Sequence, residues 1–106
     1  MYIILLGTAG AGKSTLAGEL KSVMEETGAN VAIVNFDPAA EKLPYDADVD
    51  VRNYVNIGDF LDKGLGPNGS LVSAVDSLIN YSDKIRNEID KFKPDFTIID
   101  TPGQLE

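Results

Sequence analysis

The residues best suited to chemistry lie near the start of the chain. Gly7 to Thr15 read GTAGAGKST and follow an apolar run, Tyr2 to Leu6. This is the phosphate-binding pattern GxxxxGK[ST] between a strand and a helix. Lys13 can reach terminal phosphates, and the Ser14 hydroxyl can ligate Mg²⁺. Backbone N–H groups at the helix N-terminus can cradle a polyphosphate, and the candidates are those of Gly10, Ala11, Gly12 and Thr15. The alternative is a glycine-rich turn with an exposed lysine, but such a turn would not need a strand before it and a helix after it.

A second group of polar residues ends another apolar run, Phe96 to Ile99. Asp100 at the end of that run is in the Walker B position, where its carboxylate would hold Mg²⁺ through water beside the phosphate loop. Gly103 follows at the D-x-x-G spacing and can present its N–H to a γ-phosphate. Gln104 is placed to orient an attacking water, although it could also be an exposed loop residue.

Asp37 closes a third apolar run, Val31 to Phe36. Ligands of open α/β sheets bind at the carboxyl edge of the strands, so Asp37 could orient a water, or a Mg²⁺-bound water, opposite Asp100. An Asp-Pro turn explains the same residue equally well.

The stretch Asp46 to Asp50 is similar to the start of a calcium loop. It lacks the turn glycine and the distal glutamate of that loop, so we interpret it as an acidic loop. The nearby cations Arg52 and Lys42 could approach a phosphate, but we interpret them as surface charges.

These residues need a framework of strands and helices. The apolar runs predict strands at Tyr2–Leu6, buried on both faces, Val31–Phe36 and Phe96–Asp100. Helices are predicted from Lys13 to about Glu26, around Ile57–Leu61, and from Leu71 to Phe92 after a turn at Gly66–Ser70. Glu41 to Asn53 is predicted to be a loop. Strands alternating with helices predict an α/β fold, a P-loop NTPase with a parallel sheet flanked by helices, as an incomplete three-layer sandwich.

The composition of the chain limits the kinds of molecule that it can bind. The chain has 106 residues, a formal charge of -8, no cysteine and no histidine. Strong negative charge disfavours non-specific binding to nucleic acids or anionic membranes. The absence of cysteine and histidine excludes disulfides, thiolate metal sites and histidine general bases. No apolar stretch suits a membrane span or a signal peptide, so we expect a cytoplasmic protein.

Gly66-Pro67-Asn68 stands between the second and third predicted strands. The chain resembles the GPN-loop GTPases from the first strand to Glu106. The resemblance rests on this tripeptide together with the stretches GTAGAGKST, LPYDADVDVR and DTPGQLE. The phosphate loop is shared by many NTPases, whereas Gly-Pro-Asn at this place combined with DTPGQ-x-E is specific.

The resemblance implies a homodimer that binds GTP and GDP and hydrolyses GTP with Mg²⁺. It implies that Gly66, Pro67 and Asn68 reach into the partner's active site and contact phosphate in trans. It also implies that four acidic and amide residues surround the metal and the water, namely Asp37, Asp100, Gln104 and Glu106. From the residues alone, Gly-Pro-Asn is a turn and N-cap before a helix.

The guanine-reading N-K-x-D motif of the family does not occur in the sequence. Residues 1–106 are therefore expected to be the N-terminal part of a single P-loop GTPase domain, within a longer protein or as a reduced half-domain. Two other hypotheses remain from the residues. The chain could belong to a P-loop ATPase or nucleotide kinase, or it could be a non-catalytic module for phosphate, nucleotide or protein association.

Overall fold

Four parallel strands form one sheet in the spatial order β1-β4-β2-β3. The computed structural model describes residues 1–7 and 12–103. The strands are β1 (Tyr2–Leu5), β2 (Val31–Asn35), β3 (Val49–Asp50) and β4 (Phe96–Asp100). The helical elements are α1 (Lys13–Glu26), the 3₁₀ turn η1 (Val51–Asn53), α2 (Ile57–Leu61), α3 (Gly66–Ser77), the 3₁₀ turn η2 (Leu78–Tyr81) and α4 (Ser82–Lys91).

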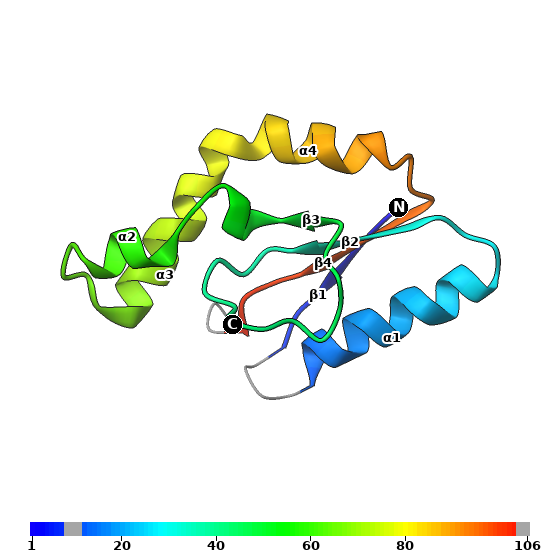
Figure 1. Cartoon of the computed structure of the whole chain (residues 1–106), viewed down its shortest axis with the longest axis horizontal. Coiled ribbons are helices and arrows are strands. Elements are labelled where there is room, and N and C mark those ends of the chain that lie inside the picture. Colours follow the sequence, from blue (N-terminus) through cyan, green and yellow to red (C-terminus); the bar gives the residue numbers. More distant parts are fainter. Residues whose placement is uncertain (8–11, 104–106) are drawn as a thin grey trace.

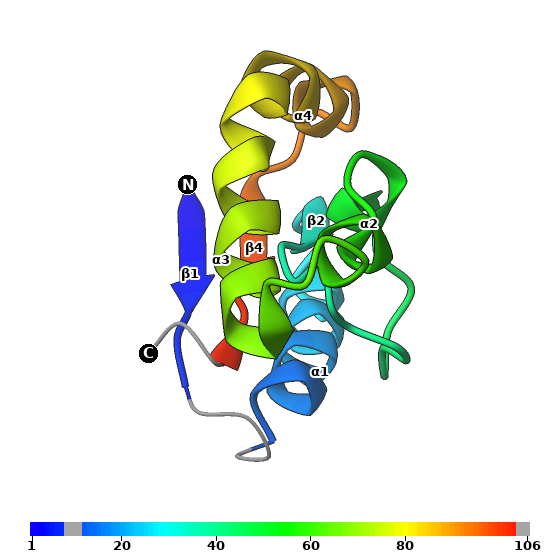
Figure 2. The ribbon, with the colours of Figure 1, turned by 90° about the vertical axis from the view of Figure 1, so that its left-hand side faces the viewer.

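Helices cover the two faces of the sheet, with α1 on one side and α3 and α4 on the other (Figures 1 and 2). The side chains of β2 alternate between two cores. Val31 and Ile33 pack with Ala17 of α1, whereas Val34 packs with residues of α3 and α4. Every residue of β2 is buried for this reason. The predicted α/β fold, with a parallel sheet flanked by helices, is confirmed.

The prediction that the first strand is buried on both faces is wrong. Among the strands of the described residues, β1 pairs with β4 alone and forms an edge of the sheet. Tyr2 is 55% exposed and Ile4 is 59% exposed, whereas Ile3 and Leu5 pack against the core beside α1. Tyr2 also borders an apolar groove of about 560 Å³ that is otherwise lined mainly by α3, η2 and α4.

The predicted long helix from Leu71 to Phe92 is also wrong, because η2 separates α3 from α4. A 3₁₀ turn has 3.0 residues per turn and so changes the direction in which the following side chains point. The change leaves Ile79 68% exposed, while Leu78 and Ile85 stay buried. The break lets α4 lie along the sheet while the start of α3 extends past it with α2 (Figure 1).

The residues Gly66-Pro67-Asn68 form the first turn of α3 instead of a turn before it. Proline suits this position because its fixed φ matches a helix and its missing N–H would have no partner there. Gly66 has a φ of 75°, a value that glycine adopts without the strain of a Cβ.

The segment Glu41 to Asn53 is not a loop throughout, because it ends in β3 and η1. β3 pairs with the carboxyl end of β2, with Val49 beside Val34 and Asp50 beside Asn35. Val49 and Val51 are buried, which accounts for the apolar residues among the acidic ones. In the described part of the chain, no helix is long and apolar enough to cross a membrane.

Candidate phosphate and metal site

The site lies where β4 ends between its two neighbouring strands. Asp100 at the end of β4 is in register with Leu5 of β1 and Asn35 of β2. Gly12 precedes α1 with a φ of 77°, so the left-handed backbone that starts this helix favours glycine. The first side chains of α1 therefore face the carboxyl edge of the sheet.

A groove of about 600 Å³, called the phosphate groove below, opens at this edge. Its lining brings together the predicted residues Gly12, Lys13, Ser14, Thr15, Asp37, Asp100 and Gly103. Gly66, Pro67 and Asn68 are not part of the lining. The predicted residues Gly10, Ala11, Gln104 and Glu106 lie outside the described residues.

The Asp100 carboxylate is buried and accepts hydrogen bonds from three side chains. The ammonium of Lys13 lies 2.8 Å from Oδ1. The Ser14 hydroxyl donates to Oδ2 over 2.7 Å, and the Tyr45 hydroxyl donates to the same oxygen over 2.8 Å. Lys13 also donates to the Thr101 carbonyl. The cation and the anion of the site therefore neutralise one another.

The donor set fits Mg²⁺. Ser14 and Asp100 offer a hydroxyl and a carboxylate oxygen 2.7 Å apart. Within residues 1–7 and 12–103, no group of three or more His, Cys, Asp or Glu side chains could hold a metal. Mg²⁺ is usually held by one or two carboxylates together with substrate phosphates, so this sparse set suits a metal that arrives with a polyphosphate.

Asp37 is held in place by Asn35, a residue that the sequence analysis missed. The fully buried Asn35 accepts a hydrogen bond from the N–H of Asp37 and donates to its carbonyl, both over 3.1 Å. The Asp37 carboxylate accepts from the N–H of Ala39 over 2.9 Å and lines the phosphate groove. Both alternatives for Asp37, a turn and a site residue, are therefore compatible. A polar residue ending the apolar strand VAIVN was the available signal, since a buried amide needs partners.

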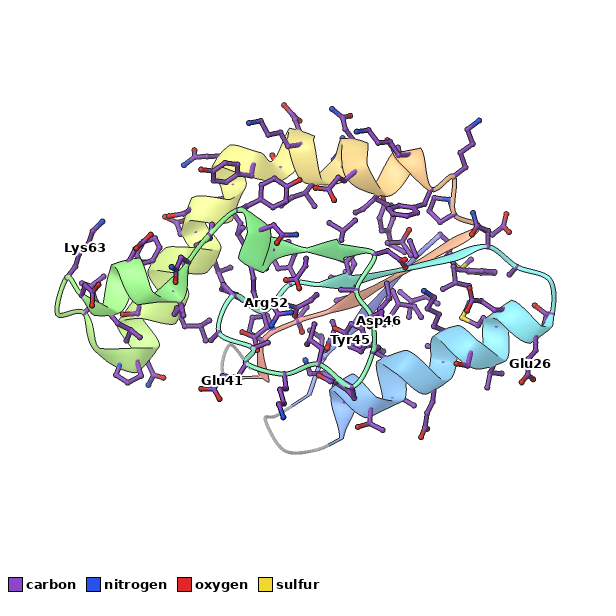
Figure 3. All side chains as sticks on the ribbon, viewed as in Figure 1. Glu26, Glu41, Tyr45, Asp46, Arg52 and Lys63 are labelled. Atoms are coloured by element: carbon purple, nitrogen blue, oxygen red, sulfur yellow. The ribbon has the colours of Figure 1, made fainter. Side chains whose placement is uncertain are left out.

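Arg52 is a surface charge in that its side chain is 34% exposed, but it has fixed partners. Its guanidinium donates to both Asp50 oxygens, at 2.6 Å from Nη2, and to the Ala40 carbonyl at 2.9 Å. Burial raises the pKa of Asp50, but hydrogen bonds from Arg52 and Asn35 outweigh it and hold the pKa below its usual value. The pair of Arg52 and Asp50 ties the segment after Asp37 to β3. Figure 3 shows Arg52 beside that segment.

Tyr45 is the second residue that the sequence analysis missed. Figure 3 shows it between the sheet and α1. Its approach depends on Gly18 of α1, because a Cβ there would lie 3.3 Å from the Tyr45 Cβ. Burial, followed by the hydrogen bond and the charge of Asp100, raises the pKa of Tyr45. The phenol therefore stays a hydrogen-bond donor at neutral pH. No local pattern in the sequence marked this residue.

The parallel sheet, the glycine-led α1 and the Lys13–Ser14–Asp100 cluster define a P-loop NTPase. The family model described as "Conserved hypothetical ATP binding protein" matches residues 5–106, and the chain belongs to that family. Curated relatives are named GPN-loop GTPases, which confirms the resemblance drawn from the sequence.

Two relatives and one solved structure show the extent of the similarity. The chain is 41% identical to GPN-loop GTPase 3 of Kluyveromyces lactis over 98% of its own length and 39% of the relative's. It is 39% identical to a GPN-loop GTPase of Pyrococcus abyssi over 100% and 43% of the two lengths. The apo crystal structure of a Pyrococcus abyssi GTPase superposes with a TM-score of 0.85 at 38% identity, covering 99% of this chain and 43% of that one. The chain thus spans about two fifths of the length of these relatives.

Proposed function

We propose that the chain binds GTP with Mg²⁺ and takes part in its hydrolysis to GDP and phosphate. The convergence of Lys13, Ser14 and Asp100 in the phosphate groove carries this proposal. A cation, a hydroxyl and a carboxylate at the N-terminus of a helix are the groups that a Mg²⁺–polyphosphate complex requires. The names of the curated relatives support GTP as the nucleotide.

In the proposed complex, the phosphates lie against the N–H groups of Gly10, Ala11, Gly12 and Thr15. Lys13 moves from Asp100 to the terminal phosphates, and Gly103 contacts the γ-phosphate through its N–H. Ser14 and Asp100 would hold Mg²⁺, Asp100 through water. When bound, Mg²⁺ supplies positive charge that offsets the charge developing on the phosphates.

Water activation is assigned to Asp37, Gln104 and Glu106. Asn35 fixes the backbone of Asp37 at the groove, which supports a positioning role for this carboxylate. Gln104 and Glu106 enter the proposal from their place in the sequence, directly after Asp100 and Gly103. Their task would be to orient the attacking water by hydrogen bonds.

The proposal includes a homodimer in which Gly66, Pro67 and Asn68 act on the partner's phosphates. The position of these residues supports it, since the start of α3 extends beyond the sheet at the end toward which the strands run (Figure 1). Pro67 in the first helical turn stiffens the segment. A rigid projecting turn can present the Asn68 amide to another molecule.

The test compares the rates at which GTP and ATP are hydrolysed in the presence of Mg²⁺. Both nucleotides are needed, because the description of the matching family model names ATP and the relatives are named GTPases. Lys13→Ala should lower turnover by roughly 10²–10³-fold, as expected for the loss of one group that stabilises transition-state charge. Asn68→Ala should lower it comparably in the dimer, whereas the control Asn80→Ala, on an exposed residue of η2, should not. Equal rates with GTP and ATP, or full activity of Asn68→Ala, would contradict the proposal in this form.

A further inference from the structure

Asp100 is held by three side chains, but only one of them has no part in holding the nucleotide. Lys13 and Ser14 belong to the start of α1 and are needed by the phosphates and the metal. Tyr45 comes from the segment between β2 and β3, 55 residues away from Asp100 in sequence. Its hydroxyl donates to Oδ2 over 2.8 Å, the same oxygen that Ser14 contacts.

Ligand binding must change the partners of this carboxylate. Lys13 has to release Asp100 in order to contact phosphate, so the carboxylate then loses its charged donor. The Ser14 oxygen can coordinate a metal through a lone pair while its hydroxyl still donates to Asp100, but the position of Ser14 is then set by the metal. Ordering a carboxylate for a metal costs conformational entropy unless a donor already holds it. The Tyr45 hydroxyl is the donor whose position does not depend on the nucleotide or the metal.

The backbone around Tyr45 is fixed well enough for such a role. Its Cβ lies against Gly18 of α1, and the Pro44 carbonyl lies against the same glycine. On one side of it, the guanidinium of Arg52 binds the Ala40 carbonyl over 2.9 Å. On the other, Asp48 accepts hydrogen bonds from the N–H of Ile33 over 2.8 Å and from Lys21 over 3.0 Å.

We infer that Tyr45 is a positioning residue for Asp100, and that its hydroxyl keeps the carboxylate directed at the metal position when Lys13 turns to the bound nucleotide. The inference rests on the proposed binding of a Mg²⁺–nucleotide complex. Gly18 is its structural partner, because a Cβ at this position would lie 3.3 Å from the Tyr45 Cβ and force Tyr45 to shift by a few tenths of an ångström. Tyr45 touches neither the nucleotide nor the reacting water in this assignment.

The experiment compares Tyr45→Phe with the unaltered chain in two binding measurements. The first is the affinity for GDP in EDTA, and the second is the affinity for Mn²⁺ at saturating GDP, followed by the paramagnetic resonance of free Mn²⁺. Loss of one hydrogen bond to a charged group should weaken Mn²⁺ binding about tenfold. The GDP affinity in EDTA should stay unchanged, because the phenol does not contact phosphates.

Tyr54→Phe is the matched control, since its hydroxyl also donates to a carboxylate, that of Glu88, outside the lining of the phosphate groove. It should leave both affinities unchanged. Gly18→Ala is a second variant with an independent signature. It replaces a helical glycine with a better helix former, so it should not unfold α1, yet it should weaken Mn²⁺ binding in the same selective way.

Two results would overturn the role of Tyr45 alone. Mn²⁺ affinity could be unchanged in Tyr45→Phe while both proteins bind GDP tightly, or the GDP affinity in EDTA could fall by the same factor, which would mark a general structural role. Failure of the unaltered chain to bind GDP under either condition would overturn the proposed function and this inference with it.

Discussion

The pairing of Lys13 with Asp100 predicts a large loss of stability when the lysine charge is removed. The two side chains are 11% and 3% exposed and lie 2.8 Å apart. Removing one partner of a buried pair costs about 3–5 kcal/mol, because the other charge is left uncompensated. Asp100 keeps the donors of Ser14 and Tyr45 in Lys13→Met, so we expect the lower end, about 3 kcal/mol.

Urea unfolding without nucleotide measures this loss directly. For a domain of this size, about 3 kcal/mol corresponds to a decrease in Tm of about 12–24 °C. Lys63→Met is the control, because Lys63 lies at the tip of the molecule beside α2 (Figure 3), outside the lining of the phosphate groove and over the ring of Phe60. This change should cost about 0.5 kcal/mol or less. The double variant Lys13→Met/Asp100→Asn should be more stable than Lys13→Met alone. A cost below about 1 kcal/mol for Lys13→Met, or simple additivity in the double variant, would refute the argument.

Three further predictions concern the surroundings of the site. The pKa of Asp50 lies below its usual 3.8, so its stabilising effect should be full above that pH and lost as the pH falls through the lower folded value. In urea unfolding, the difference between Asp50→Asn and the unaltered chain should therefore be full at pH 7 and should shrink steadily as the pH falls below 3.8. Asn35→Ala should lower the free energy of unfolding by about 2 kcal/mol in the same assay, because the carbonyl and N–H of Asp37 lose their buried partner. Ile79 is 68% exposed and lines the apolar groove, so light scattering should show less self-association of Ile79→Lys than of the unaltered chain at equal concentration.

The parts of the fold that could be predicted from sequence are those that produce a recognisable pattern within a short segment of the chain. β2 and β4 are continuous apolar runs because both of their faces are covered, and a strand of that kind needs no partner to be recognised. Lys13, Ser14 and Asp100 could be assigned to one site because the carboxyl ends of parallel strands share an edge. That inference needed only the order of strands and helices.

The features that sequence missed depend on position within the sheet or on distant contacts. β1 has the same apolar composition as an inner strand, and nothing in Tyr2 to Leu5 states that the strand lies at an edge. The apolar period continues through η2, so the 3₁₀ turn left no sign in the pattern. Asn35 and Tyr45 act through Asp37, Asp50 and Asp100 across turns or long separations.

The contacts of Asp100 also bear on how so acidic a chain could bind the anion that we propose. With a formal charge of -8, the protein repels a polyphosphate at long range. Lys13 and Asp100 neutralise one another in the phosphate groove, so neither is buried with an unpaired charge. If Lys13 left for a phosphate alone, the Asp100 carboxylate would stay behind as an uncompensated anion close to that phosphate. In the proposed complex, Mg²⁺ held by Ser14 and Asp100 would offset the charge of this carboxylate once Lys13 contacts phosphate. We therefore expect the pairing to favour the metal–nucleotide complex over free nucleotide, with Tyr45 in the positioning role inferred above.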